Sequence, residues 1–350
     1  AAGLQYGAYI LFTALSTYCG ARWIGRLAAQ QQAYLKANKE QLSREDAVAL
    51  LHTDNTSSSF YQLIAAANER SRRVFGNKGY IFAQIGLNAY PCSGNCSFCS
   101  LAEKHFVVGE HYEKSCEEVV AQVREMETDR IEALFLMTTA DFSQQKFLEI
   151  GRAVRGVLDK KVHLVANIGD FDEKMAVQLK EAGFDGAYHI VRLREGTDTQ
   201  IPREKRIATL DAITKAGLDL YYCVEPIGPE HTYEELADEM LRAREYKVNM
   251  MAVMGRVGVP GTRFADSGEI TELELTKIAA VAGLVTAPGK SMNVHEPKKM
   301  PLLAGVNQLY AEIGINPRDT SEKTEDNRGK GIRETVKLLE EAEYRVEKRK

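Results

Sequence analysis

The chain has 350 residues, a net charge of −4 at pH 7 and 27% charged residues. This length suits one large α/β domain or two ordinary domains, each with a sizeable core. Because both signs of charge are mixed and no basic run precedes the short Lys–Arg ending, nothing points to a nucleic-acid partner.

The first 75 residues are predicted to form a helical N-terminal extension. Residues 7–24 are apolar, but Arg22 interrupts them, so we expect a packing helix rather than a membrane anchor. Residues 26–34 have the pattern of an amphipathic helix. Ser43, with Asp46 three residues later, is typical of a capped helix start over 43–51, and another helix is expected over 61–75.

Apolar stretches then alternate with amphipathic helices, which predicts a parallel sheet with right-handed crossovers. The strands are expected at residues 80–87, 133–137, 163–167, 186–191, 219–224, 250–254, 291–295 and 306–311. The helices are expected at residues 115–126, 144–157, 172–182, 202–216, 233–246 and 271–285. Eight units fit an α/β fold of the (β/α)8 TIM-barrel type, and a six-unit partial barrel with a C-terminal extension is the competing arrangement. We expect the barrel over 76–315, then a polar connection and a final amphipathic helix within 316–350.

Three of the six cysteines lie in a loop rich in Pro, Gly, Asn and Ser, directly after the first expected strand. Cys92, Cys96 and Cys99 form a C-x3-C-x2-C run, which can hold three irons of a [4Fe–4S] cluster and leave the fourth iron open. Zinc is the alternative, but zinc prefers paired cysteine knuckles and no second pair is present. Such sparse cysteines, without a recognisable secretory signal, also argue against a disulfide framework. A loop at the carboxyl end of a barrel strand is where barrel enzymes build their active sites.

With the aromatic Phe98 just before its last cysteine, this motif resembles that of the radical S-adenosylmethionine (SAM) enzymes. The chain is similar to their biotin synthase-like branch, which also contains hydrogenase-cofactor maturases and methylornithine synthase. Short matches follow in the order of that branch, with RIATL at 206–210, GTRFAD at 261–266 and LAGVN at 303–307. The resemblance covers roughly residues 75–315.

The resemblance implies a [4Fe–4S] cluster whose open iron binds the amino and carboxylate groups of SAM. One electron would then split SAM into methionine and a 5′-deoxyadenosyl radical, which abstracts hydrogen from a small metabolite or cofactor precursor. The expected partners are that small molecule and an electron donor such as flavodoxin or ferredoxin. Because oxygen destroys such a cluster, a cytoplasmic location is expected.

The SAM-binding residues implied by the resemblance are Phe98, Thr138, Thr139, Asp141, Arg192, Arg194, Glu195, Arg206, Glu225, Gly228 and Glu230. Glu195, meeting the ribose or amino group, and Arg206, pairing with the carboxylate, are expected to serve the chemistry directly. Asp141 would accept the amino group or cap the helix from Gln144. Phe98 would lie near the adenine or pack within its loop. The turn from 225 to 230 would contact adenine through its backbone.

Substrate candidates follow the sixth and seventh strands or belong to the terminal motif, and they are Arg256, His295, Glu296, Lys298 and Asn307. A histidine on an apolar strand end, such as His295, is more often structural than catalytic.

Two other functions stay open. Biotin synthase-type sulfur insertion needs an auxiliary cluster, with ligands from the second, third and fifth strands and an arginine from the seventh. Here only Cys223, on the fifth strand, has a matching place, while Cys19 and Cys116 are scattered. A non-catalytic electron-transfer or sensing protein is the other alternative.

Overall fold

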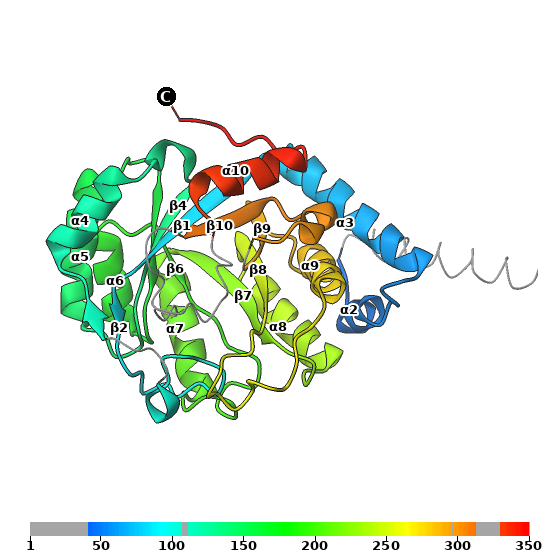
Figure 1. The fold of residues 1–350 in the computed structure, drawn as a ribbon, viewed down its shortest axis with the longest axis horizontal. Helices are drawn as coiled ribbons and strands as arrows, with labels where there is room; N and C mark the ends of the chain where they lie inside the picture. Colours follow the sequence, from blue (N-terminus) through cyan, green and yellow to red (C-terminus); the bar gives the residue numbers. More distant parts are fainter. Residues whose placement is uncertain (1–40, 107–110, 296, 313–329, 350) are drawn as a thin grey trace, which may run out of the picture.

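A computed structural model describes residues 41–106, 111–295, 297–312 and 330–349. Eight strands are parallel to their neighbours: β1 (Tyr80–Gly86), β4 (Ala133–Met137), β5 (His163–Asn167), β6 (Gly186–Tyr188), β7 (Asp219–Ile227), β8 (Met250–Gly255), β9 (Ser291–Val294) and β10 (Gln308–Glu312). They close in the order β1-β10-β9-β8-β7-β6-β5-β4, because β1 pairs with both β10 and β4. The predicted TIM-type barrel is confirmed (Figure 1).

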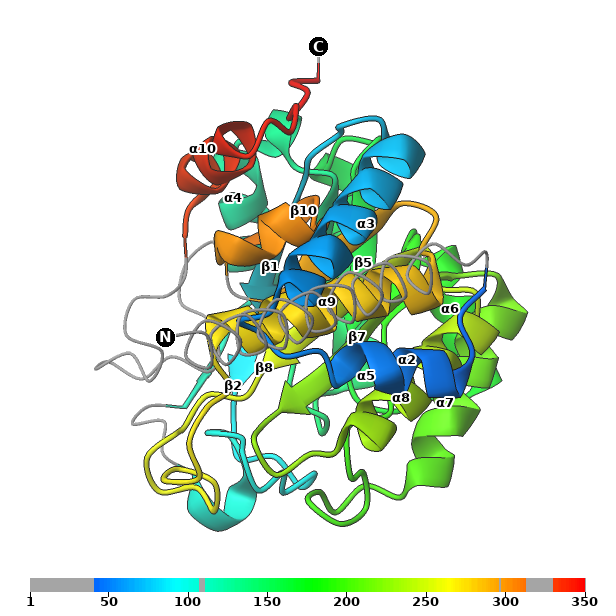
Figure 2. The same ribbon diagram turned by 90° about the vertical axis from the view of Figure 1, so that its right-hand side faces the viewer.

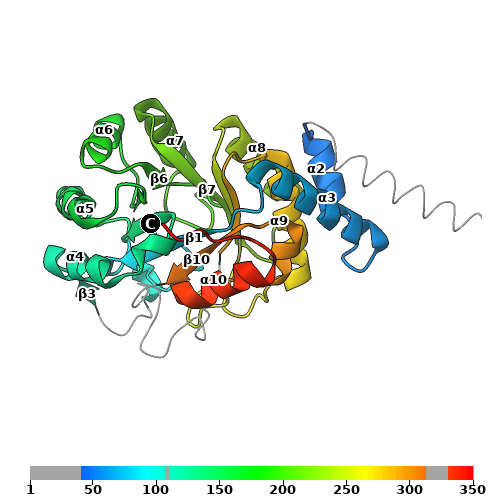
Figure 3. The same cartoon turned by 90° about the horizontal axis from the view of Figure 1, so that it is seen from above.

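Six helices surround the strands as crossovers: α4 (Cys116–Glu125), α5 (Gln144–Val157), α6 (Glu173–Glu181), α7 (Arg203–Ala216), α8 (Tyr233–Glu245) and α9 (Glu272–Thr286). Figure 3 shows them as an arc outside the strands. Most begin at a Ser, Thr or Asp whose side chain accepts the N–H of the third helical residue, as at Ser115 and Thr232. Gly217, at φ 66°, ends α7 in the left-handed conformation that favours glycine.

The remaining helices pack on the outside of the barrel: α2 (Arg44–Leu51), α3 (Ser58–Phe75) and α10 (Ile332–Glu341). Helix α2 packs on α8 and α9, and α3 packs along α9 (Figure 2). Helix α10 covers β10 and β1. No helix in the described ranges is long and apolar enough to cross a membrane, and the apolar stretch 7–24 lies outside those ranges.

An aromatic floor fills the middle of the barrel. Alternate strand residues point inward, which brings together Phe82 of β1, Phe135 of β4, Tyr221 of β7 and Tyr310 of β10. Their neighbouring ring centroids lie 5.1 to 5.8 Å apart, mostly edge to face. Above this floor, toward the carboxyl ends of the strands, the lumen (the space inside the barrel) is lined by polar side chains.

The largest departures from the expected strand limits are in β6 and β7. Strand β6 stops at Tyr188, whereas the prediction continued to residue 191, and the side chain of His189 pairs with Asp170 instead. Strand β7 runs on to Ile227, which pairs with Gly255. A short antiparallel pair, β2 (Asn88–Ala89) with β3 (Tyr112–Glu113), was not predicted.

Candidate active site at the carboxyl end of the barrel

The cluster loop, residues 90–106, follows β1 and β2 and brings three thiols to one cavity. Cys92, Cys96 and Cys99 all line this cavity, together with residues from the ends of β4, β5 and β6. Backbone hydrogen bonds from Cys92 to Leu101 O and from Cys99 to Cys96 O fold the loop back on itself. Asn95 adopts φ 43°, a left-handed conformation that asparagine tolerates well, and its side-chain oxygen accepts the N–H of Lys104.

Two neighbouring loops hold the cluster loop in place. The N–H of Ser97 donates to the Asp198 carbonyl at 2.8 Å, and the N–H of Gln200 donates to the Gly94 carbonyl at 2.8 Å. From the loop after β8, Arg263 donates its N–H to Ser97 O and pairs with Asp198 at 3.2 Å. Figures 1 and 2 show the cyan cluster loop beside the yellow loop after β8. The three segments therefore form one side of the barrel mouth.

Asp141 holds the cluster loop from the opposite side. Its carboxylate accepts the N–H and the hydroxyl of Ser93, both at 2.6 Å. The helix cap expected of Asp141 is supplied instead by Ser143, whose hydroxyl accepts the Lys146 N–H. Thr138 and Thr139 line the cavity beside it. The Thr139 N–H donates to Asn88 Oδ1, and Asn88 Nδ2 donates to the Thr139 hydroxyl.

Burial is the main cause of a raised pKa at two of the three thiols, Cys92 and Cys96. Burial raises the pKa of Cys96 to about 12; nearby Arg192 lowers it and the Cys99 and Cys92 thiols raise it. Burial also raises the pKa of Cys92. Thiolates are the metal-ligating form, so an iron centre bound here would displace thiol protons. Three thiols on one wall and polar groups on the other fit a [4Fe–4S] cluster with one open iron.

Two arginines, the buried Arg206 and the half-buried Arg192, form the cationic wall of this cavity. Arg206 of α7 is 5% exposed, so it does not lie on the solvated face of its helix. Its guanidinium contacts Glu195 Oε2 at 3.3 Å and Asp170 Oδ1 at 3.3 Å. Arg192 lines the same cavity, and its buried Nη1 has no hydrogen-bond partner among the described residues, with Glu195 Oε2 3.8 Å away. Both arginines are therefore held ready for an anionic ligand.

Glu195 lies behind this wall rather than in the cavity. Its side chain is fully buried, and Oε2 accepts the Arg192 N–H at 2.9 Å while Oε1 accepts the Thr199 hydroxyl at 2.6 Å. The structure thus places Glu195 where it orients Arg192 and Arg206. A direct contact with ribose, expected from the sequence, is not what this geometry offers.

Sequence reasoning missed a polar pair on the same wall. Asp170 Oδ1 lies 3.1 Å from His189 Nε2, and both side chains are almost wholly buried. Burial lowers the pKa of His189, whereas its hydrogen bond with Asp170 raises it. Asn167 and His189 line the cavity. The signal was present, since Asn167 ends a strand whose carboxyl end faces the cluster loop.

Several predicted residues form the rim of the barrel instead of lining the cavity. Arg194 binds Glu235 of α8 at 2.8 Å and the Glu230 carbonyl. Glu230 pairs with Arg256 at 2.9 Å, and Arg256 also donates to the Phe264 carbonyl. A side chain at Gly228 would overlap the Glu230 carboxylate. These contacts tie the loop after β7 to the loop after β8.

The other candidates are dispersed. Phe98 is half-buried in the cluster loop and does not line the cavity, and Lys298 is half-buried after β9. Asn307 lies at the opposite end of the barrel, where its amide bonds to Met292 N and Lys78 O, so it is not brought to the site. Glu296 and Cys19 lie outside the described residues.

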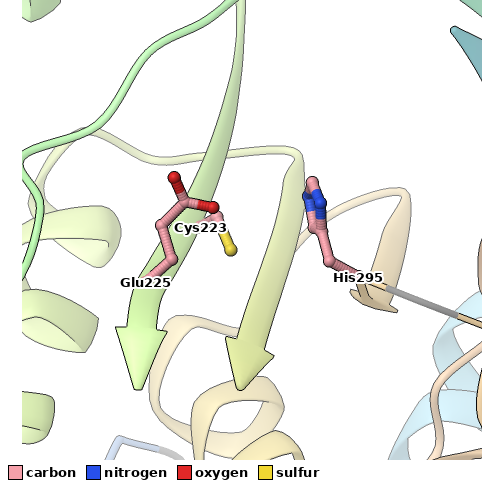
Figure 4. Close-up of side chains that lie close together, drawn as sticks. All are labelled: Cys223, Glu225 and His295. Atoms are coloured by element: carbon pink, nitrogen blue, oxygen red, sulfur yellow. The ribbon is translucent and has the colours of Figure 1, made fainter. Parts of the chain in front are cut away.

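Below the cavity, the lumen contains Cys223, Glu225 and His295 (Figure 4). Tyr188, which lines the cavity, donates its hydroxyl to Glu225 Oε2 at 2.9 Å. Glu225 Oε1 lies 3.7 Å from Arg192 Nε. The side chain of Glu225 therefore points into the barrel.

Comparisons with known proteins agree with the cysteine motif and with the barrel. Residues 90–240 match the model of the Radical SAM superfamily. The biotin synthase of Carboxydothermus hydrogenoformans is 24% identical over 265 residues, 71% of this chain and 81% of that protein. The biotin synthase of Desulforudis audaxviator is 27% identical over 286 residues, 77% of this chain and 85% of that protein.

Two solved structures share the fold. The methylornithine synthase PylB has a TM-score of 0.75 at 17% identity, covering 87% of this chain and 94% of that chain. The FeFe-hydrogenase maturase HydG of Carboxydothermus hydrogenoformans has a TM-score of 0.72 at 18% identity, covering 90% of this chain and 78% of that chain. The radical SAM and biotin synthase families use a [4Fe–4S] cluster and SAM, and the three-cysteine cavity has the donors for both. The chain therefore contains a radical SAM domain over residues 90–240 and is similar in sequence to the biotin synthases.

Proposed function

We infer that this enzyme cleaves SAM reductively and abstracts hydrogen from a small metabolite or cofactor precursor. The observation that carries the proposal is that one cavity is lined by three thiols and by two arginines, the half-buried Arg192 and the buried Arg206. A [4Fe–4S] cluster held by Cys92, Cys96 and Cys99 supplies one electron to SAM when it is bound.

The chain's own residues bind and orient SAM and the substrate. Arg206 is proposed to pair with the SAM carboxylate, and Arg192 to offer its unused Nη1 to the same group or to a substrate anion. Glu195 is proposed as a positioning residue, because it fixes both arginines from behind. Thr138 and Asn167 supply polar contacts on the opposite wall of the cavity.

The lumen below the cavity is proposed to hold the substrate. Cys223, Glu225 and Tyr188 bring polar groups to this space, and the aromatic floor closes it from below. Such an enclosed site keeps a reactive radical away from water and positions one C–H bond near it. An outside electron donor such as flavodoxin or ferredoxin is expected, and an oxygen-sensitive cluster favours the cytoplasm.

Sulfur insertion is the second candidate, because curated biotin synthases are relatives of this chain. It would require an auxiliary cluster in the lumen. Among the described residues, the inward positions of β4 and β5 are occupied by Phe135, Met137 and Val165, and Cys223 is the one lumen cysteine. The shortage of cysteine ligands among these lumen positions favours hydrogen abstraction without a second cluster.

The test is anaerobic reconstitution followed by SAM and a low-potential one-electron reductant. Formation of 5′-deoxyadenosine with an equal amount of methionine supports the proposal. Its absence, from protein that carries a full cluster and binds SAM, would favour an electron-transfer or sensing role.

A further inference from the structure

The barrel lumen contains a second group of metal-ligating side chains, separate from the cluster loop. Cys223 Sγ, a carboxylate oxygen of Glu225 and a ring nitrogen of His295 all lie within 4.8 Å of one another (Figure 4). We propose that these three residues bind a single divalent transition-metal ion of the class that includes zinc.

The strand geometry brings the three side chains together. Cys223 and Glu225 are two residues apart on β7, so they point to the same, inner side. His295 directly follows β9 and reaches them across β8. The residue of β8 in register with Cys223 is Ala252, whose small side chain leaves the space between them open.

The donor set suits a borderline-soft divalent ion. A thiolate, a carboxylate and an imidazole are all zinc ligands, and three protein ligands with one open position are typical of catalytic rather than structural zinc. Tetrahedral zinc keeps its ligand atoms about 3.3–3.8 Å apart. Rotation of the three side chains closes the remaining distance of about 1 Å. Binding converts the Cys223 thiol to a thiolate and releases its proton to solvent.

Neighbouring groups already orient two of the ligands. The Tyr188 hydroxyl donates to Glu225 Oε2 at 2.9 Å, which is how ligating carboxylates are commonly fixed. The Tyr310 ring lies 4.5 Å from the His295 ring, centroid to centroid, and fixes its plane. Cys223 is 0% exposed and Glu225 3% exposed, so an ion here would be shielded from water.

The site lies directly beneath the proposed SAM cavity. Tyr188 and Arg192 line that cavity and also contact Glu225. The open coordination position is therefore suited to a donor atom of the substrate, such as a thiolate, carboxylate or amine. The inference rests on the lumen geometry alone and holds even if the SAM chemistry proposed above proves wrong.

The test uses the full-length protein with its cluster reconstituted. Zinc chloride is added anaerobically, excess metal is removed by desalting, and zinc, iron and sulfide are counted per chain. X-ray absorption at the zinc edge then reports the ligands without interference from iron. We expect one zinc per chain, with one sulfur at about 2.3 Å and lighter ligands at about 2.0–2.1 Å.

Variants separate this site from the cluster loop. Cys223→Ala and His295→Ala should each lose the zinc, Glu225→Gln should weaken its binding, and Cys116→Ser, on helix α4 outside the barrel, should retain it. Unchanged iron and sulfide counts in each variant show that the fold and the cluster are intact. Retention of single-sulfur zinc by Cys223→Ala or His295→Ala would overturn the proposal. So would zinc with three sulfurs that disappears in Cys92→Ala, because that ion would occupy the cluster loop.

Discussion

Both hydrogen bonds that the Asp141 carboxylate accepts from Ser93, through its N–H and its hydroxyl, measure 2.6 Å. Ser93 directly follows Cys92, so this contact fixes the first cluster cysteine to the loop after β4. Asp141→Ala should therefore allow iron to dissociate several-fold faster in the presence of a chelator. Iron release is followed by the loss of visible absorbance, with Asp159→Ala on an exposed turn as the control. Equal release rates would show that the contact does not hold the loop.

Glu195 should matter for SAM binding although it does not line the cavity. Glu195→Gln removes the buried charge that holds Arg206 and Arg192, each loss of a charge-assisted hydrogen bond costing on the order of 1.5–3 kcal/mol. We expect SAM affinity to fall by about ten-fold or more while the cluster is retained. Equilibrium dialysis with labelled SAM measures this. The control is Arg203→Gln, because Arg203 is on α7 with Arg206 but pairs with Glu239, and it should bind SAM like wild type. An unchanged affinity for Glu195→Gln would remove it from the SAM site.

The lumen cysteine should not be part of an iron–sulfur cluster. Cys223→Ser is expected to keep about four acid-labile sulfides per chain, the content of one [4Fe–4S] cluster. It should also still form 5′-deoxyadenosine. Sulfide is the informative count, because a mononuclear metal contributes none. A wild-type count of about six that falls to about four in Cys223→Ser would support an auxiliary [2Fe–2S] cluster and the sulfur-insertion alternative.

The aromatic floor should be a large contributor to stability. Phe135 is 1% exposed and contacts Phe82, Tyr221 and Tyr310, so Phe135→Ala leaves a cavity in the barrel. We expect the free energy of unfolding to fall by about 3–5 kcal/mol in urea titrations. Tyr61→Ala, at a position that is 63% exposed on α3, should change it by less than about 1 kcal/mol. Similar losses for both variants would contradict this assignment of the core.

Much of the barrel could be predicted because the apolar residues of most strands and helices recur with the spacing of that element. The expected limits of β4, β5 and α5 agree with the structure at both ends. The two-residue strands β2 and β3 are too short to show a hydrophobic period, so their antiparallel pairing was not predicted. Strand β6 was overestimated because residues 189–191 are buried without being paired in the sheet.

The part of the site that one local sequence motif forms could be predicted. The contacts between residues far apart in the sequence could not. Cys92, Cys96 and Cys99 lie within eight residues, and their shared cavity agrees with their spacing. Asp141 pairs with Ser93, 48 positions away, and Asp170 pairs with Arg206, 36 positions away. Nothing in a single sequence distinguishes such partners from helix caps and surface ions. Arg192 and Arg194 show the same limit. They are two positions apart in the sequence, yet Arg192 lines the cavity and Arg194 binds Glu235.

Formation of 5′-deoxyadenosine from SAM by reconstituted wild type, Cys92→Ala, Cys96→Ala, Cys99→Ala and Cys116→Ala tests the central claim most directly. Two thiolates hold a [4Fe–4S] cluster poorly, so each change in the cluster loop should abolish both the cluster absorbance and SAM cleavage. Cys116→Ala, which replaces a cysteine on α4, should cleave SAM like wild type. Near-normal cleavage by any of the three cluster-loop variants would contradict the assignment of these cysteines to the catalytic cluster.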